Sequence, residues 1–530
     1  MTALALLGTG CLPRGAPPAG QQIIADRQAS LVGMVPPDGD GMLRLLVTHP
    51  GAEVGALDLY VAAVGASGGP PTETLLVPDY DIVDGLGCNY KVAPCSSVLA
   101  RSLWAHQTTG AFVWVNPVTG YRLDLPQYPM LMSPSGERIF NFDSGLGTQA
   151  GSGRLDDADG TSIALDDVAY PVFSAGDDFY YSTQEGDLMR IPLSGAAEKV
   201  TTGLVASSPG ASQVAVPGLY SLAPFAVVPT PDGMLLFLRR ATSASAASQL
   251  FVRDPLSGAE TALPFDAPGV PLVSTDGRWL VDASEGSGGR LTFFDYRAND
   301  TEVVDFGVPV FSGEWRPQHS DFWAASRTWN ADATVETVIQ WILSPTAAPI
   351  MVPNLDTAVP TFTPDGSYWL STPDFDMTKS RVQVGPADDP NGPKFQLNPA
   401  NTSADPIWIL DDDRLVASVY TKDTDIEART DAIVLDPRTG DSLVLGERGW
   451  LAAVGQTRVL GLFHSDEMRG DLTVSEIDTG RQTVLAPEFA VTAFAEPQGA
   501  DQLAPGTRIA YQFQARTDSP YDGIWVATCP

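Results

Sequence analysis

Hydrophobic residues along this chain occur in short runs that are separated by polar and turn-forming residues. Gln249-Leu-Phe-Val-Arg253 and Asp431-Ala-Ile-Val-Leu435 are two examples, rich in β-branched and aromatic side chains. Runs of this kind are typical of β-strands. The spacing i, i+3, i+4, i+7, which marks an amphipathic helix, is hard to find. The hydrophobic pattern therefore predicts an all-β protein built from many short strands.

A turn phrase recurs between these runs. In Pro231-Asp232-Gly233 the proline presets φ, the aspartate can bond the backbone two residues on, and the glycine supplies a positive φ. A short apolar strand follows it. Related phrases, each a turn followed by an apolar run, occupy residues 133–142, 274–281, 316–323 and 363–370. This recurrence indicates an internal repeat.

A second set of turns, of the hairpin type, gives the period of the repeat. The hairpins that begin at Asp254 and Asp295 lie 41 residues apart, and those that begin at Asp436 and Asp478 lie 42 residues apart. Four-stranded blades of β-propellers repeat at about 40–45 residues. Ten such hairpins and a final unit predict an all-β β-propeller of about eleven four-stranded blades. The blades form either two tandem rings or one large ring.

Composition divides the chain into four parts. These are a lipoprotein-like signal and tether (1–27), N-terminal propeller blades (28–204), a linker or closing strand (205–222) and a seven-bladed β-propeller (223–530). The final unit lacks a fourth strand, and an unpaired sheet edge is unfavourable. Residues 22–25 and residues 213–216 are the two candidates to complete it.

Three phrases carry a resemblance to a known repeat. Val228-Pro-Thr-Pro-Asp-Gly233, Thr361-Phe-Thr-Pro-Asp-Gly366 and Met132-Ser-Pro-Ser-Gly136, each followed by an apolar strand, resemble the TolB-type, WD-repeat-like β-propeller repeat. The resemblance covers most of residues 28–530 as recurring patches and implies a β-propeller fold. Members of this family are commonly exported bacterial proteins that bind other proteins. The chain departs from the pattern at Asp411-Asp-Asp-Arg414 and lacks the N-terminal α/β domain of TolB, so a TolB-like role in envelope translocation does not follow.

The charge balance limits the partners. The chain has 31 Lys and Arg against 64 Asp and Glu, a net charge of −33. Nucleic-acid phosphates would be repelled, so no nucleic-acid partner is expected, and anionic membrane surfaces are poor partners as well. Such an excess favours solubility and a monomeric state. The alternative is that it binds divalent cations or a basic protein.

The cysteines suggest an exported protein. A short apolar run and small residues precede Cys11, which resembles the end of a bacterial lipoprotein signal. This predicts lipidation of Cys11 in an outer-membrane lipoprotein of the periplasm or cell surface; the alternative is a disordered N-terminus with one stray cysteine. Contact with the membrane is expected only through the lipid anchor. Cys88 and Cys95 are expected to form a disulfide in an oxidising compartment, which leaves Cys529 as a single thiol.

Carboxylate clusters are the main candidates for a metal site. Asp156, Asp157 and Asp159 resemble part of a calcium loop, because hard cations prefer several carboxylate oxygens around a glycine turn. No Glu completes the EF-hand spacing, so the prediction is weak calcium binding and no other cofactor. A solvated turn is the alternative. His319 with Asp321 and His464 with Asp466 have a spacing that places both side chains on one strand face, which suits a general base or a metal ligand. The alternative for both pairs is hydrogen bonding within a loop.

These observations rank the functional hypotheses. No Gly-x-Ser-x-Gly elbow lies between a strand and a helix, which excludes a serine peptidase domain, and no catalytic residue is assigned. The leading interpretation is a non-catalytic, protein-binding or scaffolding β-propeller of the bacterial cell envelope. The first alternative is a propeller enzyme, a lyase or a glycan-acting hydrolase with carboxylates and His in the channel. The second is a structural surface or filament subunit.

Overall fold

The computed structural model describes most of the chain from residue 17 onward. The described residues are 17–35, 39–52, 55–65, 69–80, 103–107, 109, 112–125, 131–133, 135, 137–142, 151–174, 176–204, 227–230, 233–239, 249–255, 257–263, 271–274, 276–282, 290–305, 310–329, 336–352, 360–371, 382–390, 392–398, 402–421, 429–466, 469–489, 492–495, 503–514 and 519–530. Cys11, Cys88, Cys95 and the predicted linker 205–222 lie outside them, so the expectations for these residues stay predictions.

All regular elements in the described residues are β-strands, as the hydrophobic pattern predicts, and none is a helix that could cross a membrane. The first group of strands is β1 (Gln21–Ile24), β2 (Ser30–Val35), β3 (Leu43–Pro50), β4 (Leu57–Val64), β5 (Thr72–Val77), β6 (Leu103–His106), β7 (Phe112–Val115), β8 (Arg122–Leu125), β9 (Leu131–Met132), β10 (Arg138–Phe142), β11 (Gly151–Asp157), β12 (Ser162–Phe173), β13 (Phe179–Ser182), β14 (Leu188–Ile191) and β15 (Glu198–Thr201). The second group is β16 (Val227–Pro229), β17 (Leu235–Arg239), β18 (Gln249–Arg253), β19 (Glu260–Ala262), β20 (Pro271–Val273), β21 (Trp279–Asp282), β22 (Arg290–Asp295), β23 (Asp300–Asp305), β24 (Val310–Trp315), β25 (Phe322–Trp329), β26 (Glu336–Ser344), β27 (Ala347–Val352), β28 (Thr361–Phe362), β29 (Tyr368–Ser371), β30 (Gln383–Pro386) and β31 (Phe395–Gln396). The third group is β32 (Thr402–Ile409), β33 (Leu415–Thr421), β34 (Arg429–Leu435), β35 (Ser442–Gly446), β36 (Trp450–Val454), β37 (Arg458–Asp466), β38 (Arg469–Glu476), β39 (Gln482–Phe489), β40 (Thr492–Ala495), β41 (Arg508–Phe513) and β42 (Gly523–Thr528).

The strands assemble into antiparallel meanders. Among the described residues, eight sheets have four strands, the β6–β8 sheet has three and the β9–β15 sheet has seven. In the seven-stranded sheet, β12 pairs with β11 through its first half and with β13 through its second half, so it serves two units. A repeated meander of four antiparallel strands is the blade of a β-propeller. The chain is therefore an all-β protein of the β-propeller type.

The repeated turn has the same geometry in several of its copies. Gly366 has φ +73° and its N–H donates to the carbonyl of Thr363 at 2.8 Å. Asp413 has φ +68° and its N–H donates to the carbonyl of Leu410 at 3.0 Å. The turn at 411–414 lacks the Pro-Asp-Gly phrase, yet it forms the same hydrogen bond. Asp tolerates the left-handed region better than most residues, which explains why this sequence departure does not change the turn.

Burial follows the position of a strand within its sheet. Every side chain of β10 and β13 is buried, whereas most side chains of the fourth strands β5 and β23 are exposed. Inner strands are buried on both faces because neighbouring sheets pack on each side of them. Such strands appear in the sequence as continuous apolar runs, without a strict alternation of polar and apolar residues.

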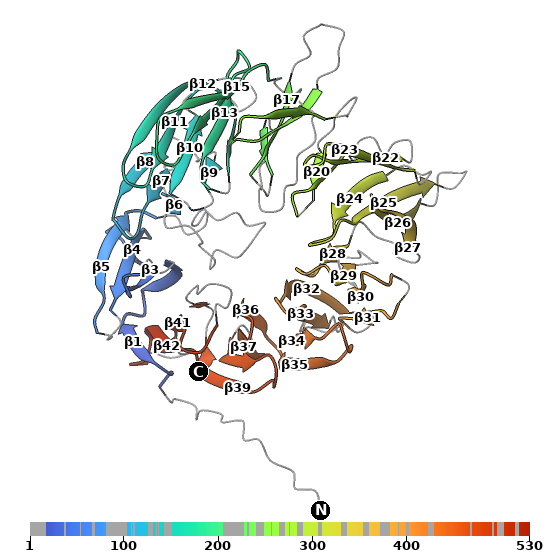
Figure 1. Cartoon of the computed structure of the whole chain (residues 1–530). Helices are drawn as coiled ribbons and strands as arrows, with labels where there is room; N and C mark the ends of the chain where they lie inside the picture. The colour runs from blue at the N-terminus through green and yellow to red at the C-terminus, as the bar shows by residue number, and fades with distance from the viewer. Residues whose placement is uncertain are drawn as a thin grey trace, which may run out of the picture.

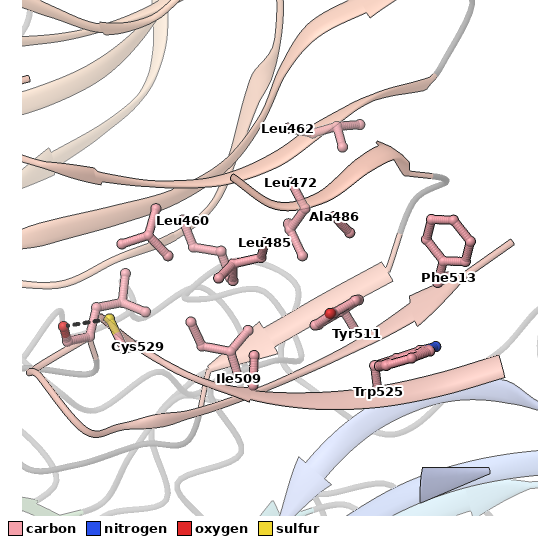
Figure 2. Packing of buried hydrophobic residues seen from close by; sticks show 13 residues of the cluster. Leu460, Leu462, Leu472, Leu485, Ala486, Ile509, Tyr511, Phe513, Trp525 and Cys529 are labelled. Carbon is pink, nitrogen blue, oxygen red and sulfur yellow. Dashed lines mark hydrogen bonds between the residues drawn. The ribbon is translucent and has the colours of Figure 1, made fainter. Parts of the chain in front are cut away.

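Hydrophobic clusters connect each sheet to its neighbour in the chain. Eleven clusters are formed by the described residues; ten join units that follow each other in the chain, including the three-stranded β6–β8 sheet, and one joins the first sheet to the last. Figure 2 shows the cluster in which Leu460 and Leu485 of one sheet face Ile509, Tyr511 and Trp525 of the next. Packing between sheets buries the apolar surface that a single thin sheet would leave exposed.

The first and last described strands meet in one sheet. β1 pairs antiparallel with β42, with Gln21 opposite Val526, and it lies beside β42 in Figure 1. The N–H of Ala19 donates to the carbonyl of Leu485 at 2.7 Å, and the hydroxyl of Tyr511 donates to the carbonyl of Ala19. The prediction that residues 22–25 complete the last unit is therefore confirmed. The other candidate, residues 213–216, lies outside the described residues.

Candidate functional site

The short turns gather at one end of every sheet. Because successive strands run in opposite directions, the turn between the first and second strands and the turn between the third and fourth lie at the same end. We call the surface formed by these turns the turn face. Its aspartates among the described residues are Asp40, Asp159, Asp177, Asp178, Asp254, Asp276, Asp321, Asp365, Asp388, Asp389, Asp411, Asp412, Asp413, Asp436, Asp441 and Asp478.

Arginines tie several of these carboxylates to the neighbouring sheet. Arg316, in the β24–β25 turn, forms an ion pair at 2.7 Å with Asp388 of the next sheet. Arg414, in the β32–β33 turn, pairs at 2.7 Å with Asp478 of the next sheet. The side chains of Asp388 and Asp478 are 81% and 71% exposed. The turn face thus keeps carboxylates in contact with solvent while arginines hold adjacent sheets together beneath them.

Two of the arginines are buried. Arg138 pairs with Asp157 at 2.7 Å and donates to the carbonyls of Asp177 and Ile191, each at 3.1 Å. Arg316 donates through Nε to the carbonyl of Gly366 at 2.6 Å. Both arginines therefore bind the carbonyl of a residue with positive φ in the following four-stranded unit. In each case the contact joins the turns of two successive units.

The most perturbed carboxyl groups of the turn face are Asp365 and Asp413, which lie close enough for each to shift the pKa of the other. Asp365, in the β28–β29 turn, accepts hydrogen bonds from the Thr363 hydroxyl at 2.9 Å and the Ser367 N–H at 2.7 Å. Asp413, in the β32–β33 turn, is only 5% exposed. Its Oδ2 accepts from Arg438 at 3.3 Å, while its Oδ1 is buried and meets no donor. Two carboxyls can bond only if one carries a proton, so Oδ1 lacks a donor when both are ionised.

The environment separates the pKa values of this pair. Burial, followed by the hydrogen bond and the negative charge of Asp365, raises the pKa of Asp413 to about 6. Burial alone would also raise the pKa of Asp365, but the hydrogen bonds from Ser367 and its other neighbours outweigh burial and lower that pKa to about 2. Carboxyls at hydrogen-bonding distance cannot both ionise without repulsion, so they titrate as a coupled pair.

The predicted calcium residues lie at the β11–β12 turn. Asp156 pairs with Arg154 at 2.8 Å and Asp157 pairs with Arg138 at 2.7 Å, on opposite faces of β11. Asp159 accepts from the Thr161 N–H at 2.8 Å. Hydrogen bonds from Thr161 lower the pKa of Asp159, whereas burial raises the pKa of Asp157. The three carboxylates are thus bound to other partners, and no metal-binding group of three or more His, Cys, Asp or Glu occurs among the described residues.

The other candidate residues are placed as follows. Cys529 is buried, and its Sγ donates to the carbonyl of Leu503 at 3.3 Å (Figure 2). Asp321 pairs with Arg316 at 3.2 Å, and the ring of His319 lies against Gly366. The side chains of His464 and Asp466 lie outside the described residues. His319 is therefore next to the turn that carries Asp365, on the acidic turn face.

Sequence reasoning did not find the Asp365–Asp413 pair. Asp365 stands in the repeated phrase and Asp413 ends the run Asp411-Asp412-Asp413, but 48 positions separate them in the sequence. The available signal is the alignment of the two turns, because Asp413 occupies the place that Gly366 holds in its own turn. An aspartate at the glycine position is a small departure from the motif, and only the packing of adjacent sheets shows what its carboxyl meets.

Comparisons with known proteins reveal weak similarity. No protein-family model matches the chain, and no curated protein matches it. Among solved structures, it is similar to a eukaryotic initiation factor at 11% identity, covering 70% of this chain and 90% of that one, with a TM-score of 0.40. It is also similar to the β-propeller domain of Swd1 from Myceliophteria thermophila at 14% identity, covering 57% and 95%, with a TM-score of 0.25. TolB from Acinetobacter baumannii matches at 14% identity, covering 55% and 75%, with a TM-score of 0.23.

Proposed function

We propose that this protein is a non-catalytic, protein-binding β-propeller of the bacterial cell envelope, exported and lipid-anchored through Cys11. The partner is a protein with a basic surface that docks on the turn face. The observation that carries the proposal is the concentration of exposed carboxylates there, such as Asp388 and Asp478. Charge complementarity steers association and selects partners, and a net charge of −33 suits a basic partner.

The proposed arrangement is a single closed ring of eleven blades: the eight four-stranded sheets, the three-stranded sheet, and two blades from the seven-stranded sheet. Two observations support one ring over two. The first is the cluster that joins Ala169 and Leu188, before the predicted linker, to Leu235 and Phe237 after it. The second is the cluster that joins Leu31 and other residues of the first sheet to those of the last. A single ring presents the turns of all blades on one face, which gives the partner a broad surface.

The enzyme alternative is less well supported by the acidic pair. The two catalytic carboxyls of glycoside hydrolases stand about 5–9.5 Å apart, so that substrate or water fits between them. Asp413 is only 5% exposed and its Oδ1 is buried, which leaves little room for a substrate beside Asp365. A carboxyl buried in this way suits a shared proton better than glycan cleavage. Weak calcium binding at Asp156, Asp157 and Asp159 stays a prediction.

The proposal is tested by site-specific photo-crosslinking of the full chain in native membranes. A photoreactive residue in place of Asp412 or Asp478 on the turn face is expected to capture a basic protein, with a yield that falls as salt rises. The matched controls are the same residue in place of Asp124 on β8 or Glu198 on β15, which are also exposed carboxylates but lie on fourth strands. Equal capture from all four positions, or none from the turn face, would contradict the proposal.

A further inference from the structure

The left-handed position of the repeated turn points at the preceding sheet. A Cβ added to Gly366 would lie 2.3 Å from the carbonyl oxygen of Pro317, in the turn of the sheet before it. Asp177 occupies the corresponding position with φ +64°, and its Oδ1 accepts from the N–H of Ser135 at 3.1 Å, again in the preceding turn. At Gly366 and Asp177, a side chain at this position is therefore directed into the contact between two successive turns.

Asp413 holds the same position, but its carboxyl meets a different group. Where Asp177 finds a backbone N–H, Asp413 lies beside the Asp365 carboxyl, which raises its pKa, and beside the Thr363 hydroxyl, which lowers it. The Oδ1 of Asp413 is buried without a donor, and the residue is 5% exposed. A buried carboxylate oxygen that faces a second carboxylate is strongly unfavourable unless a positive charge or a proton lies between them.

The charged groups around Asp413 supply only part of the positive charge that would offset this repulsion. Arg438, from the β34–β35 turn, reaches Oδ2 at 3.3 Å, but its own side chain is 51% exposed. Asp436 of the same turn and Tyr368 at the start of β29 are further titratable groups nearby. An exposed guanidinium is a weak counter-charge because solvent screens it, so Arg438 offsets only part of the repulsion between the carboxyls.

We propose that Asp365 and Asp413 share one proton and form an acid-strengthened latch between the β28–β31 sheet and the β32–β35 sheet. With the proton bound, the Asp413 carboxyl donates a hydrogen bond to Asp365 and joins the two turns. Without it, two anions face each other and the turns separate more readily. The latch follows from the contact between the sheets, and it is independent of the proposed protein-binding function.

The sign of the effect follows from proton linkage. The pKa of Asp413 is raised from 3.8 to about 6 in the folded chain, so between these values the folded form holds a proton that the unfolded form has released. Stability from this proton is therefore present at mildly acidic pH and is lost as pH rises through about 6. The pKa of Asp365, lowered from 3.8 to about 2, contributes stability that is lost only as pH falls towards 2.

Native-state hydrogen exchange on the full chain tests the latch, because it reads local opening of each sheet. After correction for the intrinsic exchange rate, amide protection in peptides covering 360–371 and 402–421 should rise roughly tenfold from about pH 7.5 to about pH 5 in the wild type. Asp413→Asn carries a permanent donor, and Asn also tolerates positive φ. This variant should match or exceed wild-type protection at the higher pH and should lose the pH dependence.

Asp177→Asn is the matched control, since Asp177 holds the same turn position opposite an N–H. It should lose protection around its own turn by a similar factor at both pH values. The latch is overturned if Asp413→Asn keeps the wild-type pH dependence or is less protected at both pH values. Repeating the exchange measurement at the higher pH with calcium and with a chelator tests whether a proton or a cation lies between the two carboxyls. If calcium restores protection in the wild type but not in the variant, the site binds a cation and the shared-proton proposal is wrong.

Discussion

At the scale of single residues, the left-handed position of the turn decides how adjacent sheets meet. Gly366 is in close contact there with Pro317, His319 and Arg316 of the preceding sheet. Gly233 has φ +84°, yet a Cβ added to it would meet nothing within 4 Å. Both glycines therefore need a positive φ, but only Gly366 is also crowded by neighbouring atoms. The cost of the positive φ and the cost of the crowding can thus be measured separately.

Gly366→Ala should destabilise the protein more than Gly233→Ala. Both variants place a Cβ at positive φ, which costs about 1–2 kcal/mol. Only at Gly366 does the new Cβ collide with a backbone oxygen, at 2.3 Å, so the turns must also move apart at a further cost of about 1–3 kcal/mol. Denaturant unfolding of the two variants gives the comparison, and equal losses would show that the two turns do not touch.

At the scale of elements, buried arginines hold the start of one sheet against the next. Arg138 is 1% exposed and contacts three groups: the Asp157 carboxylate and the carbonyls of Asp177 and Ile191. Its partners belong to two successive four-stranded units. Removal of the guanidinium would leave a carboxylate and two carbonyls without their donor, so the cost is much larger than that of a surface pair.

Arg138→Met should therefore lower the free energy of unfolding by about 3–5 kcal/mol. The control is Arg122→Met, which breaks the exposed Arg122–Asp124 pair of 2.9 Å on β8. Exposed pairs of this kind contribute about 0–1 kcal/mol. Urea denaturation of both variants at one pH and salt concentration measures the difference. A loss for Arg138→Met as small as that of the control would mean that the buried network adds nothing to stability.

At the scale of the whole molecule, the sheet that contains both chain ends is the closing element. β1 supplies the outer strand of β40–β42, and Ile23 and Ile24 enter the cluster between that sheet and the first one. Without β1, the edge of β42 would be unpaired, and open edges pair with other chains. The closing strand thus prevents edge-to-edge association as well as adding burial.

Deletion of residues 1–25 should lower the melting temperature and promote self-association. The two isoleucines alone represent about 3–6 kcal/mol of lost burial, in addition to the hydrogen bonds with β42. Deletion of residues 1–16 is the control, because it keeps β1 and the Ala19 contacts. Differential scanning calorimetry and light scattering measure the two effects. A monomeric 26–530 chain with an unchanged melting temperature would contradict the role given to β1.

The sequence predicted the local elements well. Gly366, Gly277 and Gly233 all adopt positive φ in turns that precede a strand, as the repeated phrase indicates. The hairpin at Asp436-Pro-Arg-Thr-Gly440 joins β34 to β35. The strand that completes the last sheet, β1, overlaps residues 22–25, one of the two segments predicted for this role. These features depend on a few consecutive residues or on hydrophobic periodicity, which are properties of the chain itself.

The candidate site could not be predicted in the same way. The carboxylate run at 411–413 was visible in the sequence, but its aspartates have different partners. Asp412 binds Arg414 at 2.8 Å, whereas the side chain of Asp413 points towards Asp365. The run at 156–159 likewise divides between Arg154, Arg138 and Thr161. Adjacent residues on a strand or a turn point in different directions, so a cluster in sequence is not a cluster in space.

The sequence alone determined the strands, the tight turns, the repeat and the acidic charge, because each depends on local backbone preference or on composition. Only the tertiary structure decided which carboxyls are buried together and which are held by an arginine of the next sheet. The reason is physical: pKa values and hydrogen-bond partners depend on distances of a few ångströms, and here the packing of one thin sheet against another sets those distances.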